Sequence, residues 1–333
     1  MSILRRLTIW IACLTVAILM MAMVLASAAR AEGAVMGMER EVMVDGGAAP
    51  LYGSLLTPAG ARPGPAVLLI AGSGPTDRDG SSTVPGVRPA SLKLIAEELG
   101  AAGVASLRYD KRAIAKSAPA AVSEADLRFT TAVDDAVQFA RLLKAQPGVS
   151  CVILLGHSEG ALIAALAAQK VETCGVIEVS GAGRPFGVVL REQLAARNLP
   201  PPVMTKIEAG LSELEQGRQI ANIPGLEALF RPSVQPYLIS QLTLDPAKAL
   251  AGVKRPVLIL QGDNDVQVSV QDARLLAAAR PDAKLVIVPG MNHVLKAAPS
   301  DRAGNIATYA DPGRPLAPGL MQAIVAFVKS ARR

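Results

Sequence analysis

This chain contains a serine, a histidine and two candidate aspartates, which are the residue types that acyl transfer needs, and they occur in a suitable order. Ser158 lies at the centre of Gly156-His157-Ser158-Glu159-Gly160, which is a G-x-S-x-G pattern. A serine hydroxyl attacks a carbonyl when a neutral imidazole accepts its proton. The chain contains 2 histidines. His157 lies inside the pattern, where we expect its side chain to point elsewhere, so His293 is the candidate base.

The acid that orients the base is expected between the nucleophile and the histidine. The apolar run 257–260 is typical of a buried strand, and it leads into a loop that holds Asp263 and Asp265. Loop aspartates often form turns or cap helices, so one of the two is expected to have that structural role. Either choice gives the order Ser, Asp, His, which α/β-hydrolases use and other serine-hydrolase folds do not.

The residues around Ser158 predict the element that positions it. Residues 151–155 form a short apolar run suited to a buried strand, and the Ala- and Leu-rich residues 161–169 favour a helix. A strand, a sharp glycine-flanked turn and a helix together make a nucleophile elbow, which exposes the serine above the sheet. The helix also directs its first amides towards the place where an oxyanion would form. A plain glycine-rich turn is the alternative reading.

Strand and helix patterns alternate along most of the chain, which predicts a doubly wound, mostly parallel sheet. The expected strands are 39–44, 51–56, 66–70, 104–109, 151–155, 174–180, 257–260 and 284–288. The expected helices include 90–102, 129–145 and 320–328. Residues 184–252 interrupt this alternation of strands and helices. They contain no clear strand, and they contain three helical segments, near 188–197, 203–216 and 226–238.

Four segments together resemble the α/β-hydrolases, and more narrowly the bacterial serine esterases with an HGSGPxDRDG loop. The segments are Ile70–Gly80, the Leu107–Arg112 turn LRYDKR, the elbow, and Gly262-x-x-Asp265-x-x-Val268 paired with Asn292-His293. The resemblance extends over about residues 40–330. It implies an α/β-hydrolase fold with a mostly parallel eight-stranded sheet, helices on both faces and a helical lid insertion.

The resemblance also assigns roles to individual residues. It favours Asp265 over Asp263 as the acid, which gives the triad Ser158, Asp265 and His293. It implies an oxyanion hole made by the backbone amides of Ser73 and Glu159. Charged residues 77–79 and 108–112 are expected mainly to hold these loops by ion pairs.

The same resemblance implies a division of the chain into parts. Residues 32–183 and 253–333 would form the hydrolase core, and residues 184–252 would form a lid over Ser158, although a plain surface insertion gives the same pattern. A lid would exclude water and shape the substrate pocket. The candidates for the pocket wall are Phe186, Met204, Leu211, Phe230 and Tyr237.

The chain departs from the resemblance at two places. Ala71 stands where the family often has histidine, which matters little if the oxyanion donor is a backbone amide. Ala113-Ile114-Ala115 follows Arg112 where glycines are usual. This second departure puts the shape of that turn in doubt.

These residues indicate a serine esterase that acts on small carboxylic esters with short to medium acyl chains. The same triad would serve a peptidase, an acylaminoacyl hydrolase or a thioesterase, and a binding protein could keep the fold without catalysis. The mechanism needs no cofactor. No residues have metal-ligand spacing, so no metal is expected.

Residues 1–31 have the pattern of a signal peptide. Arg5 and Arg6 precede an uncharged run, 7–25, and Ala29-Arg30-Ala31 offers a cleavage site, with Ala26-Ser27-Ala28 as an alternative. We therefore expect export to the periplasm or outside the cell. The apolar run is long for a signal peptide, so an uncleaved anchor in the inner membrane is the alternative, and it would be the chain's one contact with a membrane.

Charge argues against nucleic acid as a partner. The net charge of +6 falls to +3 without residues 1–31, which hold three arginines and no acid. No basic stripe with interleaved aromatic residues is present. About 300 residues remain, enough for one large domain.

Cys151 and Cys174 are each expected at the start of a strand. If these strands are parallel neighbours, the two sulfurs lie side by side at one edge of the sheet. An exported protein can keep a disulfide there. Two unpaired buried cysteines are the alternative.

Overall fold

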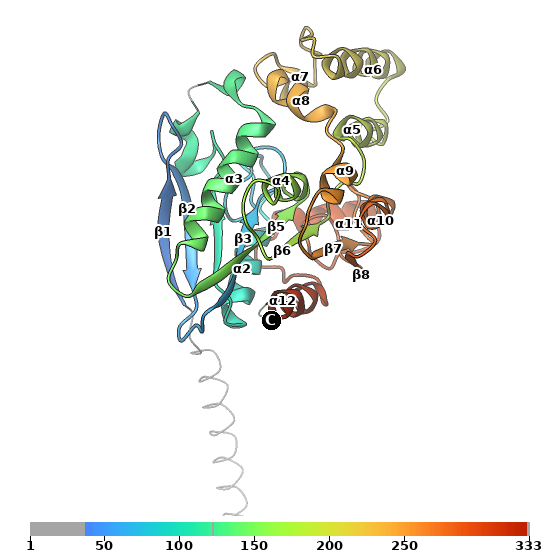
Figure 1. The fold of residues 1–333 in the computed structure, drawn as a ribbon. Helices are drawn as coiled ribbons and strands as arrows, with labels where there is room; N and C mark the ends of the chain where they lie inside the picture. Colours follow the sequence, from blue (N-terminus) through green and yellow to red (C-terminus); the bar gives the residue numbers. More distant parts are fainter. Residues whose placement is uncertain (1–36, 122, 332–333) are drawn as a thin grey trace, which may run out of the picture.

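A single eight-stranded sheet organises the part of the chain that the structure, a computed structural model, describes, namely residues 37–121 and 123–331 (Figure 1). The strand order is β1-β2-β4-β3-β5-β6-β7-β8. β1 and β2 are antiparallel, β2 is antiparallel to β4, and the strands from β4 to β8 are parallel. The α/β-hydrolase fold expected from the sequence is confirmed.

The strands are β1 (Met38–Val44), β2 (Leu51–Thr57), β3 (Gly64–Ile70), β4 (Ser106–Tyr109), β5 (Val149–His157), β6 (Gly175–Val179), β7 (Val257–Gly262) and β8 (Lys284–Val288). Every residue of β3, β4, β6 and β7 is buried. This explains why the central strands are continuous apolar runs, since a parallel strand is covered on both faces. The edge strand β1 is mostly exposed.

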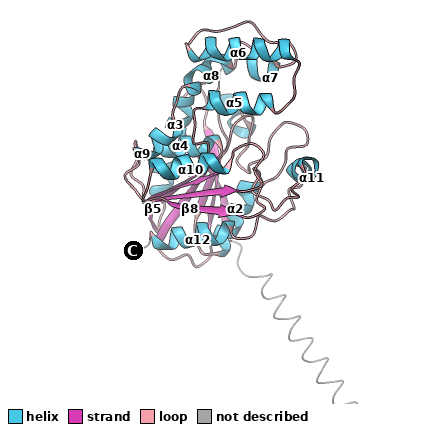
Figure 2. Cartoon of the chain, turned by 90° about the vertical axis from the view of Figure 1, so that its right-hand side faces the viewer, coloured by secondary structure: helices cyan, strands magenta, loops and turns pink. Residues whose placement is uncertain are grey.

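The helices of the core are α2 (Ser91–Ala101), α3 (Phe129–Lys144), α4 (Glu159–Ala167), α9 (Pro246–Ala251), α10 (Val270–Ala279), α11 (Arg302–Ala307) and α12 (Leu320–Ser330). α2 and α12 pack on one face of the sheet, and α3, α4, α9 and α10 pack on the other (Figure 2). Short 3₁₀ turns occur at η1 (Ala115–Ala120), η2 (Glu124–Asp126) and η3 (Thr308–Ala310).

Between β6 and β7 the chain leaves the sheet and forms four helices with a hydrophobic core of their own. They are α5 (Phe186–Ala195), α6 (Pro201–Glu215), α7 (Glu227–Phe230) and α8 (Gln235–Leu242). They form a separate group at the top of the molecule, above α4 and α10 (Figures 1 and 2). α9 also falls within residues 184–252, but it packs on the sheet core through Ala249 and Leu250. The separate helical core therefore ends with α8.

One helix expected in this region is two helices. Residues 226–238 were predicted as a single segment, whereas α7 ends at Phe230 and α8 begins at Gln235. Pro236 lies in the first turn of α8. Proline is tolerated there because the first amides of a helix have no intrahelical acceptor, but it interrupts a continuous helix.

Cys151 and Cys174 form a disulfide, with 5.8 Å between their Cα atoms. β5 and β6 are parallel neighbours, and Ile153 of β5 lies opposite Gly175 of β6. Cys151 is near the start of β5 and Cys174 directly precedes β6. The bond therefore joins the amino ends of two central strands, as their positions predict. Among the described residues, no helix combines the length and apolar character needed to cross a bilayer.

Candidate active site

The turn between β5 and α4 holds Ser158 in a conformation that few residues adopt. Its φ is 56° and its ψ is −120°, a region where an L-residue is strained. The flanking glycines explain why the chain can turn here. A Cβ on Gly156 would lie 2.0 Å from the Gly160 oxygen, and a Cβ on Gly160 would lie 2.4 Å from the Ile70 oxygen. The G-x-S-x-G pattern is therefore a steric requirement of this elbow.

The structure brings Ser158, His293 and Asp265 together at the carboxyl ends of β5, β8 and β7. His293 Nε2 lies 3.1 Å from Ser158 Oγ, and His293 Nδ1 lies 2.9 Å from Asp265 Oδ2. Both distances are within hydrogen-bonding range. Loops after three separate strands supply the three side chains, so the parallel sheet assembles them.

The two candidate aspartates have different partners. Asp265 Oδ1 accepts hydrogen bonds from the amides of Gln267 and Val268, which leaves Oδ2 for the imidazole. Asp263 instead accepts the amide of Gly290 at 2.6 Å. Asp263 thus pins the turn that follows β8, and Asp265 is the carboxylate that faces His293.

The charge state of Asp265 follows from its surroundings. Burial alone would raise its pKa, but the facing imidazole and the hydrogen bonds to the carboxylate outweigh burial and lower the pKa below its ordinary value. Gln261 Nε2 is also 3.2 Å from Asp265 Oδ2. The carboxylate therefore stays ionised and can stabilise an imidazolium when His293 accepts a proton.

His157 has a structural contact that the sequence did not reveal. Its Nε2 donates to the backbone oxygen of His293 at 2.8 Å, so it fixes the loop that carries the base. Burial, and then the neighbouring His293, lower the pKa of His157 to about 4. The ring is therefore neutral at ordinary pH and carries one proton. The hydrogen bond to the His293 oxygen requires that proton to be on Nε2.

The loop after β3 lies against the nucleophile and contains the expected oxyanion donor Ser73. A Cβ on Gly72 would come within 3.2 Å of Ser158 Cβ, so this glycine permits the close approach. Glu159 is the first residue of α4, where amides have no intrahelical acceptor. The two amides thus belong to segments on either side of Ser158, as an oxyanion hole requires.

Lys111 helps to hold the loop after β3 in place. Its Nζ donates to the Gly72 oxygen at 2.6 Å and lies 3.9 Å from the Glu159 carboxylate. That carboxylate also accepts hydrogen bonds from Tyr237 and Gln241 of α8. Finding these contacts from sequence requires knowing that β3 and β4 are neighbours, because Lys111 is far from Gly72 along the chain.

Most of the other charged residues of these loops form ion pairs, as the sequence predicts, but Asp77 instead accepts hydrogen bonds from the amides of Asp79 and Ser81. Arg78 binds Asp110 at 2.7 Å, and Asp79 binds Arg108 at 2.7 Å. These two pairs tie the loop after β3 to β4 and to the turn after it. Arg112 makes a two-pronged contact with Asp135 of α3, with both distances 2.7 Å.

The turn that lacks the usual glycines keeps a glycine-like backbone. Ala113 has a φ of 64° and Ala115 a φ of 45°. Such angles cost an L-residue about 1 to 2 kcal/mol each. The ion pair of Arg112 with Asp135 and its contacts with the Gly46 and Ala120 oxygens hold the turn in this shape.

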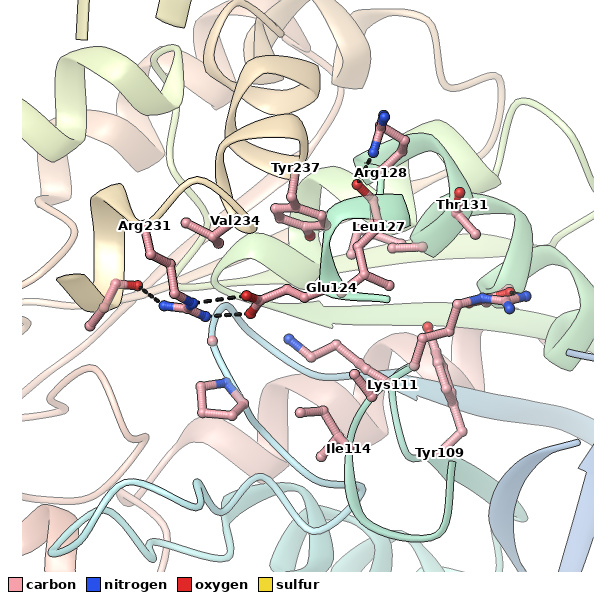
Figure 3. Close-up of a pocket in the computed structure, with 18 residues that line it drawn as sticks. Tyr109, Lys111, Ile114, Glu124, Leu127, Arg128, Thr131, Arg231, Val234 and Tyr237 are labelled. Carbon is pink, nitrogen blue, oxygen red and sulfur yellow. Dashed lines mark hydrogen bonds and ion pairs between the residues drawn. The ribbon is translucent and has the colours of Figure 1, made fainter. Parts of the chain in front are cut away.

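Two adjoining cavities open at the site. One, of about 250 Å³, contains Ser158 and His293 and is lined further by Leu92, Val294 and Tyr309. The other, of about 350 Å³, lies between the turn after β4, α3 and the helices α7 and α8 (Figure 3). Gly74 and Pro75 line both cavities, so the two adjoin at the loop after β3.

The structure corrects most of the expected pocket wall. Tyr237 lines the larger cavity. Phe186, Met204, Leu211 and Phe230 instead pack together in the core of α5–α8. The reason is that these helices form a cluster of their own, so their apolar side chains point towards one another. Ile114, Leu127 and Val234 supply apolar wall that the sequence did not single out.

The sheet, the elbow and the Ser–His–Asp geometry define a serine hydrolase of the α/β-hydrolase superfamily. A comparison with family models narrows this class. The chain belongs to the family described as serine aminopeptidase S33 (Hydrolase_4), whose model matches residues 90–297.

Similar proteins agree with this placement. Esterase EstD from Thermotoga maritima is 28% identical over 262 residues, which cover 77% of this chain and 60% of that protein. Est1E from Butyrivibrio proteoclasticus, solved with ferulic acid, has a TM-score of 0.55 at 17% identity and covers 87% of this chain and 96% of its own. The Pyrococcus furiosus esterase Pf2001 has a TM-score of 0.53 at 16% identity and covers 89% and 94%. At such identities the structural likeness concerns the fold.

Proposed function

We propose that this protein hydrolyses carboxylic esters with short to medium acyl chains through an acyl-enzyme. The observation that carries the proposal is the hydrogen-bonded series from Ser158 through His293 to Asp265, at 3.1 and 2.9 Å. The similarity to an esterase over 77% of the chain supports it. The resemblance of the loop sequence Ile70–Gly80 to the HGSGPxDRDG loop of bacterial esterases is a second support.

The reaction has two halves. His293 accepts the Ser158 proton while Oγ attacks the ester carbonyl, and Asp265 stabilises the imidazolium. The amides of Ser73 and Glu159 receive the oxyanion, and loss of one such donor typically costs about 3 kcal/mol of transition-state stabilisation. The imidazolium gives its proton to the departing alcohol. Water, deprotonated by His293, then cleaves the acyl-enzyme and releases the acid.

We assign the helices within residues 184–252 the role of a lid. α7 and α8 line the larger cavity together with the loops that follow β3 and β4, and α8 reaches the elbow helix through the Tyr237–Glu159 hydrogen bond of 3.0 Å. The cleft below has room for a small ester. A lid at this position would restrict acyl length and exclude water during the first half-reaction.

An aminopeptidase is the second candidate, because the matching family model carries that description. A free peptide amino terminus needs a carboxylate to bind its ammonium. Glu124 lies in the larger cavity, but Arg231 and Ser233 already engage it. Because Glu124 already has these partners, it is not free to bind a substrate ammonium group, which favours an ester substrate over a peptide.

We also propose that residues 1–31 direct export to the periplasm or outside the cell, with an uncleaved inner-membrane anchor as the alternative. These residues lie outside the described part of the chain. The Cys151–Cys174 disulfide supports an oxidising compartment. Mass spectrometry of the exported protein tests the proposal: an amino terminus at Glu32 supports cleavage, and an intact Met1 favours the anchor.

The test of activity is hydrolysis of p-nitrophenyl esters from acetate to palmitate, measured beside Ser158→Ala. Activity that disappears in the variant supports a serine esterase, and its dependence on chain length measures the cleft. If the folded protein hydrolyses no ester, the ester proposal fails, and peptide amides, thioesters and a binding role come next.

A further inference from the structure

The larger cavity has no nucleophile, but it contains a buried ammonium group with hydrogen-bonding capacity to spare. Lys111 Nζ enters it from the turn after β4 and faces the Arg231–Glu124 pair across the open space (Figure 3). An ammonium has three donors. One is used by the Gly72 oxygen at 2.6 Å, and Glu159 at 3.9 Å is beyond hydrogen-bonding distance.

The two carboxylates in the cavity wall are already neutralised. Arg112 holds Asp135 through two hydrogen bonds of 2.7 Å. Arg231 binds both oxygens of Glu124, and Ser233 adds a third hydrogen bond. Among the described residues, these are the acids of the cavity lining.

The positive groups are not neutralised to the same degree. The negative charge of Glu159 lies near Lys111, but the two side chains form no hydrogen bond. Tyr237 and Gln241 donate hydrogen bonds to the Glu159 carboxylate instead. Arg128 lies at the rim, and its guanidinium donates to the Ala125 and Leu127 oxygens without any acid partner among the described residues. The cavity lining therefore holds more basic than acidic side chains, four against two. Burial also lowers the pKa of Lys111, which means that its ammonium lacks the solvation it would have in water.

The remaining wall is apolar. Ile114, Leu127 and Val234 line it. A ligand that fits must therefore present a hydrocarbon or aromatic body with an anionic end. A carboxylate would give Lys111 a hydrogen bond to an anion, which no described carboxylate of the protein supplies.

We propose that the larger cavity binds the free carboxylate of an ester substrate, with Lys111 as its main contact, so that the preferred substrates are esters with a second, anionic group. The cavity adjoins the triad pocket at Gly74 and Pro75, which line both, and the proposal places one molecule across the two. The smaller pocket would hold the reacting ester and the larger one its carboxylate. This substrate preference rests on the proposed esterase function.

The test uses pairs of substrates that differ only in charge. For the acyl side, p-nitrophenyl hydrogen adipate is compared with its terminal carboxamide. For the alcohol side, para-acetoxybenzoate is compared with para-acetoxybenzamide. We expect kcat/KM to favour the carboxylate by about tenfold or more in one pair, as a charge-assisted hydrogen bond allows. The protein is expressed from the complete chain.

Three variants locate the preference. Lys111→Met keeps most of the side-chain volume, and we expect it to reduce the ratio of charged to neutral kcat/KM to about one. Lys93→Met removes a cation from α2, where Lys93 is half exposed and outside both cavities, and it should leave the ratio unchanged. Thr131→Glu adds a negative charge to the cavity wall and should lower the ratio. The ratio is the readout because Lys111 also braces the Gly72 loop.

A binding measurement separates this proposal from the esterase proposal. Calorimetric titration of the Ser158→Ala protein with para-hydroxybenzoate, adipate and their amides needs no turnover. Tighter binding of a carboxylate than of its amide, lost in Ser158→Ala/Lys111→Met, supports the site even if no ester is hydrolysed. Equal or better use of the amide in both substrate pairs and in binding overturns it. So does a preference that survives in both Lys111→Met and Thr131→Glu.

Discussion

The triad and the helices above it are held in place by different kinds of interaction. The loops that follow the parallel strands β5, β7 and β8 carry Ser158, Asp265 and His293, and the Asp265 side chain has no exposed surface. The helices α5–α8 have their own apolar core. They contact the sheet domain through polar pairs, such as Tyr237 with Glu159, and through the Tyr237 ring, which packs against Phe129. The difference fits the proposed roles, in which the sheet would determine the chemistry and the lid would determine which molecules reach Ser158.

The largest expected effect lies on the sheet side of this comparison. Asp265→Asn should lower kcat by about 10⁴-fold, because the imidazole loses its orientation and its counter-charge. Asp263→Asn removes only a contact with the Gly290 amide and should cost far less. Steady-state kinetics of both variants decide the assignment. A greater loss in Asp263→Asn would make Asp263 the acid.

Removal of the disulfide tests whether the triad geometry depends on a covalent bond at the amino ends of the strands, which is the edge of the sheet opposite Ser158. The bond closes a loop with a sequence separation of 23. Its removal in Cys151→Ala/Cys174→Ala should lower the free energy of unfolding by about 3 kcal/mol. Because the bond lies at the amino ends of the strands, kcat of the folded variant should stay near the wild-type value. Denaturant titration and kinetics test both points, and a large fall in kcat would contradict the second.

The buried His157 predicts a loss of stability in acid. In the unfolded chain a histidine takes a proton near pH 6.5, whereas the folded site takes it near pH 4. The stabilisation is therefore complete above about pH 6.5. It falls towards pH 4, by at most about 1.4 kcal/mol per pH unit. Urea unfolding at pH 7 and pH 5 should show a smaller difference for His157→Gln than for wild type, and equal differences would refute the idea.

On the lid side, a single ion pair should matter less. Arg231 and Glu124 connect the end of α7 to η2 at the mouth of the larger cavity, and both side chains are more than one-third exposed. Arg231→Met should lower stability by no more than about 1 kcal/mol. We expect KM for a bulky ester to change while kcat for acetate stays constant. A fall in kcat for acetate would show that the lid also supports the triad.

The smallest effect concerns the strained turn beneath the cavity. Ala113→Gly should stabilise the protein by about 0.5 to 1 kcal/mol, because glycine adopts a positive φ without the steric cost. Ala118→Gly, at an exposed alanine in η1, is the matched control and should not stabilise. Thermal unfolding of both variants distinguishes relief of backbone strain from a general effect of glycine.

Sequence reasoning predicted the sheet well because local patterns encode it, and the three side chains that it grouped, Ser158, Asp265 and His293, lie together in the structure. The elbow follows from two glycines with no room for a Cβ, and the central strands follow from continuous apolar runs. The choice of Asp265 needed the resemblance to known hydrolases, because spacing alone left Asp263 open.

The cavity wall was predicted poorly for a physical reason. Whether Phe230 faces its own helix cluster or the substrate depends on how helices pack, and composition does not record this. The contact of Lys111 with Gly72 likewise depends on which strands are neighbours.

The position of β1 has a consequence for how the enzyme would meet its substrates. Met38 pairs with Thr57, and Leu56 pairs with Ser106 at the start of β4. The chain therefore enters the fold at the amino edge of the sheet, while Ser158 lies at the carboxyl edge. If residues 1–31 remain in a bilayer, the catalytic mouth would face the aqueous phase, and dissolved molecules rather than membrane lipids would have direct access to it.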